Sequence, residues 1–155
     1  MPFPTISYDR IAARGYPGMV YSTEGADADI SLVIGATSAD VAPGLAMVFD
    51  TLEGTAKLPT AGGKFAGIAV VDRTLPFSNG NVFKPYDQVT GKRAGAICVQ
   101  APGAVAQGDP VYFVNATGAL TNVAGSGANT LIENAEWIIP TTGAAISAVR
   151  LAVSK

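Results

Sequence analysis

The sequence predicts an all-β fold: a compact β-sandwich or barrel-like domain with an extended N-terminal arm. Three observations lead to this prediction. From residue 31 onward, short apolar runs alternate with turn residues, which is typical of domains built from many short strands. No segment of ordinary helix length carries apolar residues at helical spacing without an interrupting glycine. Glycine and proline supply 18 and 10 of the 155 residues, and both are common in the turns between strands.

Residues 1–30 form the expected arm, and residues 31–155 form the expected β-rich domain. Prolines and glycines interrupt the arm, and neither a helical nor a strand period is sustained in it. Tyr8, Tyr16 and Tyr21 give the arm aromatic surface. Such a segment forms an extended strand at a sheet edge, docks on a partner, or packs as an irregular lead-in against its own domain. The sequence leaves these three alternatives open.

Eight strands are expected in the domain, most of them bounded by glycine, proline, asparagine or aspartate. The last strand shows the clearest alternation, because Val149, Leu151 and Val153 all point to one face. Turn residues at 115–118 and 141–143 predict two hairpins. The expected strands span residues 31–34, 45–49, 67–72, 95–99, 111–115, 120–123, 135–139 and 145–153.

Two segments between these strands are expected to be loops. Residues 73–93 contain an Asn-Gly-Asn turn, two prolines that would break a strand ladder, and five charged side chains, including Lys92. Residues 124–130 are rich in glycine and alanine, as in a flexible loop tip. One short helix is expected near residues 38–42, opened by a threonine or serine N-cap.

Composition argues against several classes of function. The chain has no histidine, which removes the commonest general base and the usual zinc ligand. Its single cysteine allows no intramolecular disulfide and no CxxC site. The net charge is −2 and no basic cluster exceeds the pair Lys92-Arg93, so no nucleic-acid surface is expected. The apolar runs are too short to span a bilayer and the N-terminus lacks a signal pattern, so we expect a soluble protein made in the cytoplasm.

The candidate reactive residues are better explained as structural ones. Cys98 has no histidine to activate it, so a buried thiol is expected. Asp27 and Asp29 have a spacing that suits calcium, but no closing glutamate follows, so a solvated turn is expected. Asp109, in a Gly-Asp-Pro sequence, is expected to form a turn rather than to act in catalysis.

Four further patterns match known sites only in part. Glu133 and Glu136 would lie on opposite faces of a strand, so a solvated pair is expected rather than a glycosidase pair. Residues 115–117 form an N-glycosylation sequon, but nothing else indicates secretion. Residues 62–64, Gly-Gly-Lys, lack the full P-loop pattern. Residues 103–111 resemble part of a biotinyl or lipoyl carrier domain, but no lysine lies in the required hairpin. No catalytic residue, metal site or cofactor is therefore expected.

A series of short motifs runs along nearly the whole chain. Residues 65–74 read Phe-Ala-Gly-Ile-Ala-Val-Val-Asp-Arg-Thr, and residues 104–112 read Ala-Val-Ala-Gln-Gly-Asp-Pro-Val-Tyr. In order and spacing these stretches resemble the capsid cement (decoration) proteins of tailed bacteriophages, with their G-(I/V)-A-V-x-D-x-T strand and V-x-x-G-D-P-V-Y turn. The chain departs from that pattern mainly in the extended loop at 75–93. The other shared stretches are residues 15–20, 30–31, 42–48, 117–121, 135–137 and 148–151.

This resemblance implies a structural protein without catalytic residues or cofactors. Members of the family are compact β-rich domains that form trimers on the outer capsid surface and bridge neighbouring major capsid protein subunits after the shell expands. The resemblance therefore implies a virion location, synthesis in the host cytoplasm, and no direct contact with nucleic acid or membrane. The arm is the expected capsid-binding region, through Tyr8, Tyr16, Pro17 and Tyr21. The alternatives are another virion β-module (a head fibre, tail or receptor- or glycan-binding domain) and an enzyme or cofactor carrier.

Overall fold

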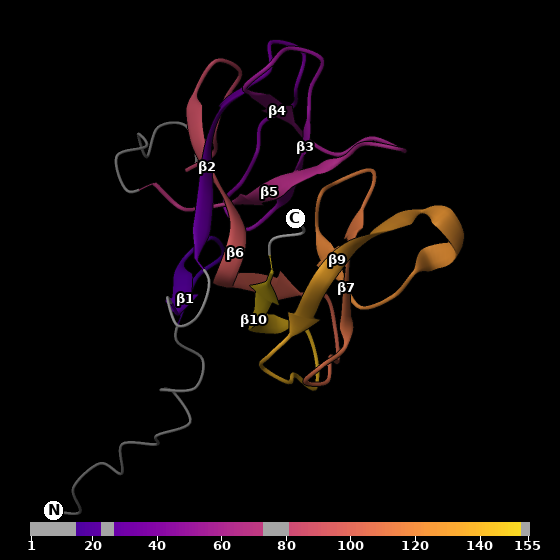
Figure 1. Cartoon of the computed structure of the whole chain (residues 1–155). Coiled ribbons are helices and arrows are strands. Elements are labelled where there is room, and N and C mark those ends of the chain that lie inside the picture. Colours follow the sequence, from indigo (N-terminus) through magenta and orange to yellow (C-terminus); the bar gives the residue numbers. More distant parts are fainter. Residues whose placement is uncertain (1–14, 23–26, 73–80, 153–155) are drawn as a thin grey trace, which may run out of the picture.

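A computed structural model describes residues 15–22, 27–72 and 81–152 of the chain (Figure 1). This part consists of ten strands and one short 3-10 turn, Gly125–Gly127, which confirms the predicted all-β class. Among the described residues, no helix has the length and apolar character needed to cross a bilayer. The strands are β1 (Val20–Ser22), β2 (Ala28–Ile34), β3 (Ala46–Phe49), β4 (Thr55–Lys57), β5 (Phe65–Ala69), β6 (Gln88–Ala101), β7 (Pro110–Val114), β8 (Leu120–Thr121), β9 (Asn129–Trp137) and β10 (Ala145–Leu151).

Five of the strands close into a small barrel. The hydrogen-bonded order runs β2-β4-β3-β5-β6, and β6 pairs with β2 to complete the ring. Neighbours are antiparallel except for β2 and β4, which pair in parallel. Each strand contributes buried side chains to one apolar cluster, because alternate residues of a strand point to the same face. The cluster contains Leu32, Ile34, Val41, Met47, Ala56, Ala66, Ala69, Phe83 and Val89.

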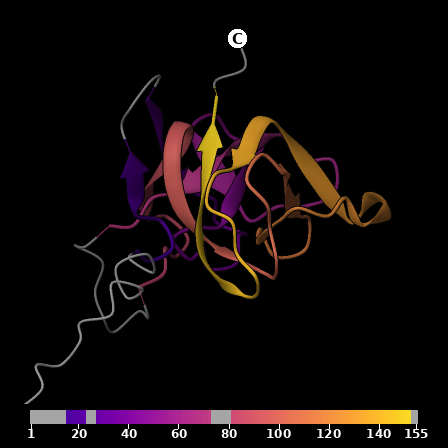
Figure 2. The same cartoon turned by 90° about the horizontal axis from the view of Figure 1, so that it is seen from below.

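The remaining strands form a sheet that continues from the barrel through β6. Its order is β6-β10-β9-β7-β8, and β1 pairs with β6; all of these pairs are antiparallel. A second apolar core joins this sheet to the side of the barrel formed by β3 and β5, where the rings of Phe65 and Phe113 stack with centroids 6.2 Å apart. Figures 1 and 2 show the two bodies side by side. The fold therefore combines the predicted barrel and sandwich.

Strand β6 belongs to both bodies. Its first half pairs with β2 and β5 in the barrel, and residues 95–101 pair with β10 in the sheet. Gly95 lies where the pairing changes and has φ +102°, a conformation that side chains other than glycine rarely adopt. A Cβ atom at Gly95 would also lie 2.8 Å from Oδ1 of Asp27. Glycine is therefore required at the junction of barrel and sheet.

Each of the eight predicted strands overlaps a strand of the structure, although the bounds differ by several residues. Both predicted hairpins are confirmed, since β7 pairs with β8 and β9 pairs with β10. Strands β1 and β4 were not predicted, because three residues carry too little periodicity to be recognised.

Two loop and helix predictions are wrong. The loop expected at residues 73–93 ends before Gln88, where β6 begins. The helix expected at residues 38–42 does not form, because Val41 pairs with Phe83 in an isolated bridge and Ser38 Oγ accepts a hydrogen bond from the backbone N–H of Leu58. Long-range pairing overrides local propensity in these two segments. The loop expected at residues 124–130 is confirmed in part, because residues 125–127 form the 3-10 turn and β9 begins only at Asn129.

The described part of the expected arm consists of residues 15–22 and 27–30. These residues supply β1 and the start of β2, and both strands pair with β6. Of the three alternatives for the arm, the strand at a sheet edge describes β1. The expected boundary between residues 30 and 31 falls inside β2. Tyr8 lies outside the described residues.

Candidate functional site

Cys98 is a buried structural residue, as the sequence predicts. It lies on β6 with 1% of its surface exposed, and this burial raises the pKa of its thiol. A thiol that stays protonated is a poor nucleophile. Within the described ranges, no group of three or more His, Cys, Asp and Glu side chains could hold a metal ion.

Asp109 organises the turn that leads into β7. Its Oδ2 accepts hydrogen bonds from the backbone N–H of Ala106 and from Nδ2 of Asn122, both at 2.9 Å. The hydrogen bond from Ala106, followed by that from Asn122, lowers the pKa of Asp109. The predicted turn role of Asp109 is confirmed.

Glu133 and Glu136 are both exposed on β9. The strand is irregular between them, because Asn134 has φ +58°, so simple alternation does not decide which face each side chain occupies. Glu136 pairs with Arg150 across to β10, with Oε1 and Nη1 3.3 Å apart. Glu136 is thus a surface ion-pair partner, which agrees with its predicted solvation.

The most unusual charged group is Lys92, which is only 1% exposed although it lies on a barrel strand. Its ammonium pairs with the carboxylate of Asp27 and, at 3.1 Å, with that of Asp29. Burial lowers the pKa of Lys92, but the hydrogen bonds and negative charges of the two carboxylates outweigh burial, so the net pKa lies above 10.5. Lys92 is therefore a charged residue with two counter-ions inside the fold.

This ion cluster corrects two sequence-based interpretations. Asp27 and Asp29 do not form a simple solvated turn: Asp29 lies within β2, and both carboxylates neutralise Lys92. Lys92 itself is not a loop residue. The physical reason is that a buried ammonium requires opposite charge nearby, and two aspartates on one side of β6 provide it. The cluster fastens the start of β2 to the junction at Gly95.

Three of the four predicted partner-binding residues of the arm, Tyr16, Pro17 and Tyr21, are described by the structure and lie on a segment that is hydrogen-bonded to the domain. The backbone N–H of Gly18 donates to the carbonyl of Cys98, and the Gly18 carbonyl accepts from Val71, both at 2.9 Å. Pro17 packs so closely on Gly44 that a Cβ atom added to Gly44 would lie 2.6 Å from the Cβ of Pro17. Tyr16 and Tyr21 remain 37% and 48% exposed. The structure thus presents these tyrosines on a fixed backbone.

A groove of about 550 Å³ lies where the barrel meets the sheet. Lys64 and Arg93 border it from the barrel, and Leu131 and Glu133 border it from β9. Arg93 is held over the ring of Phe49, 5.8 Å from its centroid. Among the described residues that line it, the groove combines two cations with one carboxylate. A glycosidase site would need a pair of carboxylates.

A second exposed surface, which the sequence did not indicate, lies at the end of the barrel where β2 finishes. We define this barrel tip as residues 35–40, 50–55 and 84–87 together with Val33. Leu52 and Tyr86 are 72% and 76% exposed there, and Val33 is 38% exposed. Single exposed apolar residues in loops are common on protein surfaces and give no signal in the sequence. Only the fold shows that Val33, Leu52 and Tyr86 lie at the same end of the barrel.

Comparisons with known proteins place the chain among phage proteins. Residues 3–153 match the family described as structural cement protein (E217 gp24/Pam3 gp6). Among solved structures, a chain of "The capsid of Myoviridae Phage XM1" has the same fold, with a TM-score of 0.70 and 20% sequence identity over 90% of this chain and 91% of that chain. No curated protein sequence matches. Because the family match covers nearly every residue, the chain belongs to the family of phage structural cement proteins.

Proposed function

We propose that this capsid cement protein binds the outer surface of a phage head and bridges neighbouring major capsid protein subunits, so that it stabilises the expanded shell. The observation that carries the proposal is the family match over residues 3–153. Contacts that are individually weak stabilise a shell when they are repeated over a lattice, because linked contacts act with a high effective concentration. Fixed, exposed apolar side chains serve this role without a reactive centre.

One capsid contact is proposed on residues 1–30, through Tyr8, Tyr16, Pro17 and Tyr21. Support comes from the exposure of Tyr16 and Tyr21 on a backbone that is already hydrogen-bonded to β6. A contact on an ordered segment loses little conformational entropy on binding. Tyrosine is also enriched among the residues that dominate interface energies, since it buries a large ring and keeps a polar hydroxyl.

The proposed assembly is a homotrimer on the outside of the virion, made in the host cytoplasm and acting without contact to DNA or membrane. Threefold association multiplies each capsid contact, which favours tight attachment to a repeating shell. The net charge of −2 disfavours binding to nucleic-acid phosphates. Light scattering of the purified protein checks the assembly: the proposal expects three times the chain mass of 15.7 kDa.

Co-sedimentation with empty heads of the parent phage tests the function. We expect saturable binding of the purified protein to expanded heads and none to unexpanded heads. Bound protein should also raise the temperature at which expanded heads disrupt. Binding to neither form of the head would refute the proposal and favour a receptor- or glycan-binding module, which a glycan array would then examine.

Variants of the arm test the proposed contact. Deletion of residues 2–14 removes Tyr8 but leaves all of the described contacts, and the pair Tyr16→Ser and Tyr21→Ser removes the two exposed rings. Each change should weaken binding to expanded heads at least tenfold while the circular dichroism spectrum stays unchanged. Leu131→Ser is the matched control, because Leu131 is 47% exposed on β9. Full binding by both arm variants would exclude the arm as a contact.

A further inference from the structure

We propose that the barrel tip is a second capsid-docking surface, which inserts Leu52 and Tyr86 into an apolar pocket of a major capsid subunit bordered by lysine and arginine. This inference rests on the proposed cement function and extends it. The arm gives each chain of the proposed trimer one contact, and a second contact at the tip lets a single chain bridge two subunits by itself.

Backbone hydrogen bonds bring the three loops of the tip together around the end of β2. The N–H of Val33 donates to the carbonyl of Gly54 at 2.9 Å, and the N–H of Tyr86 donates to the carbonyl of Ile34 at 2.8 Å. The loop after β2 is joined to the 84–87 loop by an ion pair of Lys84 and Asp40 at 3.0 Å. These contacts therefore join the three loops at the end of β2, which lies in the upper part of Figure 1.

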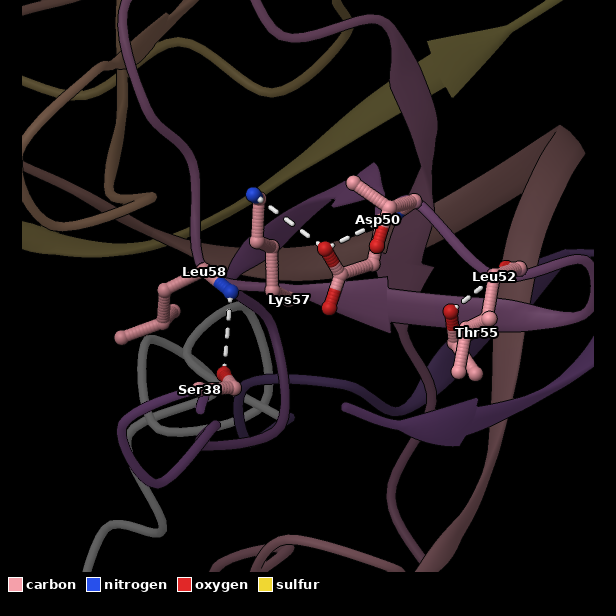
Figure 3. Close-up of polar contacts among 7 residues, drawn as sticks. Ser38, Asp50, Leu52, Thr55, Lys57 and Leu58 are labelled. Atoms are coloured by element: carbon pink, nitrogen blue, oxygen red, sulfur yellow. Dashed lines mark hydrogen bonds and ion pairs between the residues drawn. The ribbon is translucent and has the colours of Figure 1, made fainter. Parts of the chain in front are cut away.

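Leu52 is held at the apex of the turn between β3 and β4 by polar contacts on both sides (Figure 3). On one side, Oδ1 of Asp50 accepts from the N–H of Thr51 at 2.8 Å and pairs with Nζ of Lys57 at 3.3 Å. On the other side, Oγ1 of Thr55 donates to the carbonyl of Leu52 at 2.6 Å. A leucine 72% exposed on such an ordered turn buries apolar area on docking without ordering its backbone first.

Tyr86 occupies a backbone position that favours glycine. The N–H of Asp87 donates to the carbonyl of Lys84 at 3.0 Å, which closes a four-residue turn with Pro85 second and Tyr86 third. Tyr86 has φ +73°, a value that glycine adopts readily and a bulky side chain does not. Tyr86 is 76% exposed, so packing among the described residues does not account for a tyrosine here. Strain of this kind, kept at the surface, is typical of binding positions.

The charges around the tip select the chemistry of the partner. The carboxylates of the three loops outnumber their lysines even when Lys57, which reaches in from β4, is included. A pocket bordered by basic side chains complements such a rim, whereas an acidic border repels it. The carboxylates are those of Asp40, Asp50, Glu53 and Asp87, and the lysines are Lys57 and Lys84.

The tip is also well placed for bridging. Strand β2 runs from the arm side of the molecule to the tip, from Ala28 to Ile34. At about 3.3 Å per residue, the strand separates its two ends by roughly 20 Å. Two apolar surfaces at opposite ends of one strand allow one chain to touch two different subunits.

The test compares three purified variants with the wild-type protein in saturation binding to expanded heads. Tyr86→Gly removes the ring and relieves the backbone, so we expect a melting temperature equal to or above that of the wild type and binding at least tenfold weaker. Leu52→Ser should weaken binding to a similar extent. Val123→Ser is the matched control, because Val123 is 59% exposed outside the tip, and it should bind like the wild type.

The outcomes separate the inference from the function on which it rests. Wild-type binding together with weak binding by a folded Tyr86→Gly protein supports the tip. Wild-type affinity in both tip variants overturns the inference but leaves the cement function intact. If light scattering gives the tip variants a different assembly mass from the wild type, the tip mediates contacts between copies of this chain, and the inference is overturned. Failure of the wild type to bind removes the function and the inference together.

Discussion

The two halves of β6 are stabilised by different forces, although they form one continuous strand. The first half, in the barrel, alternates exposed and buried residues and carries the buried ammonium of Lys92. The second half, in the sheet, is buried almost throughout, with Ile97 and Val99 fully enclosed. Opposite charges fasten the first half to β2, while apolar packing between barrel and sheet holds the second.

This difference shows how one strand can serve two bodies. The stability of the apolar half depends on how completely neighbouring side chains fill the space around it. A half with a buried charge depends on its counter-ions, because an unpaired ammonium is far better solvated by water than by the interior. Gly95 separates the two halves, and mutations on either side of it should therefore show different signatures.

The largest effect is expected in the apolar half. Ile97→Ala should lower the free energy of unfolding by about 4 kcal/mol, because it opens a cavity in a fully buried core. Urea denaturation measures the loss. Thr90→Ala, at an exposed position in the barrel half, is the control and should change stability by less than about 0.5 kcal/mol. A loss no larger for Ile97→Ala than for Thr90→Ala would show that apolar packing does not stabilise the second half as described.

A somewhat smaller effect is expected from the counter-ions of the barrel half. Asp27→Asn combined with Asp29→Asn leaves Lys92 buried and unpaired, which should destabilise the fold by about 3 kcal/mol. This value is at the low end for a broken buried pair, because the two carboxylates are 36% and 45% exposed and water screens them.

Replacement of the cation itself sharpens the test. Lys92→Met keeps the aliphatic stem and removes the charge that needs neutralising, so stability should change by no more than about 1 kcal/mol. The measurement compares the denaturation midpoint of Lys92→Met with that of the Asp27→Asn, Asp29→Asn double variant. If Lys92→Met is less stable than the double variant, the ion cluster is a net source of stability rather than a requirement imposed by a buried charge.

The smallest effect is expected from pH. The pKa of Lys92 is raised above 10.5 in the folded protein. The stabilisation of the fold by the ion pairs of Lys92 is therefore complete below that pH and is lost as pH rises through the folded-state pKa. Wild-type stability should therefore fall more steeply than that of Lys92→Met as the pH rises above about 10.5. Lys92→Met changes no other titratable side chain, so the comparison isolates the contribution of Lys92. Parallel pH profiles for the two proteins would show that Lys92 does not titrate as proposed.

Sequence reasoning recovers the apolar half of β6 but not the charged half. Residues 95–99 form an apolar run between turn residues, and that local signal is sufficient to predict a strand. Residues 88–94 carry Gln, Thr, Gly, Lys and Arg, which are typical of a loop. They form a strand because β2 and β5 pair with them from distant parts of the chain. No local pattern reports such pairing.

The candidate surfaces divide in the same way. Tyr16 and Tyr21 could be selected from the sequence, because aromatic residues in a turn-rich segment are visible there, and both are exposed in the structure. Leu52 and Tyr86 lie in separate loops, and only the hydrogen bonds around the end of β2 bring those loops together. The positive φ of Tyr86 also has no sequence signal, since proline followed by tyrosine is not a recognised glycine-like turn.

Electron cryomicroscopy of expanded heads saturated with the wild-type protein tests the central claim most directly. We expect density for the protein on the outer surface, with each bound chain touching two major capsid subunits, one near β1 and one at the barrel tip. Density that touches a single subunit would contradict bridging. Absence of added density on saturated heads would contradict the cement function itself.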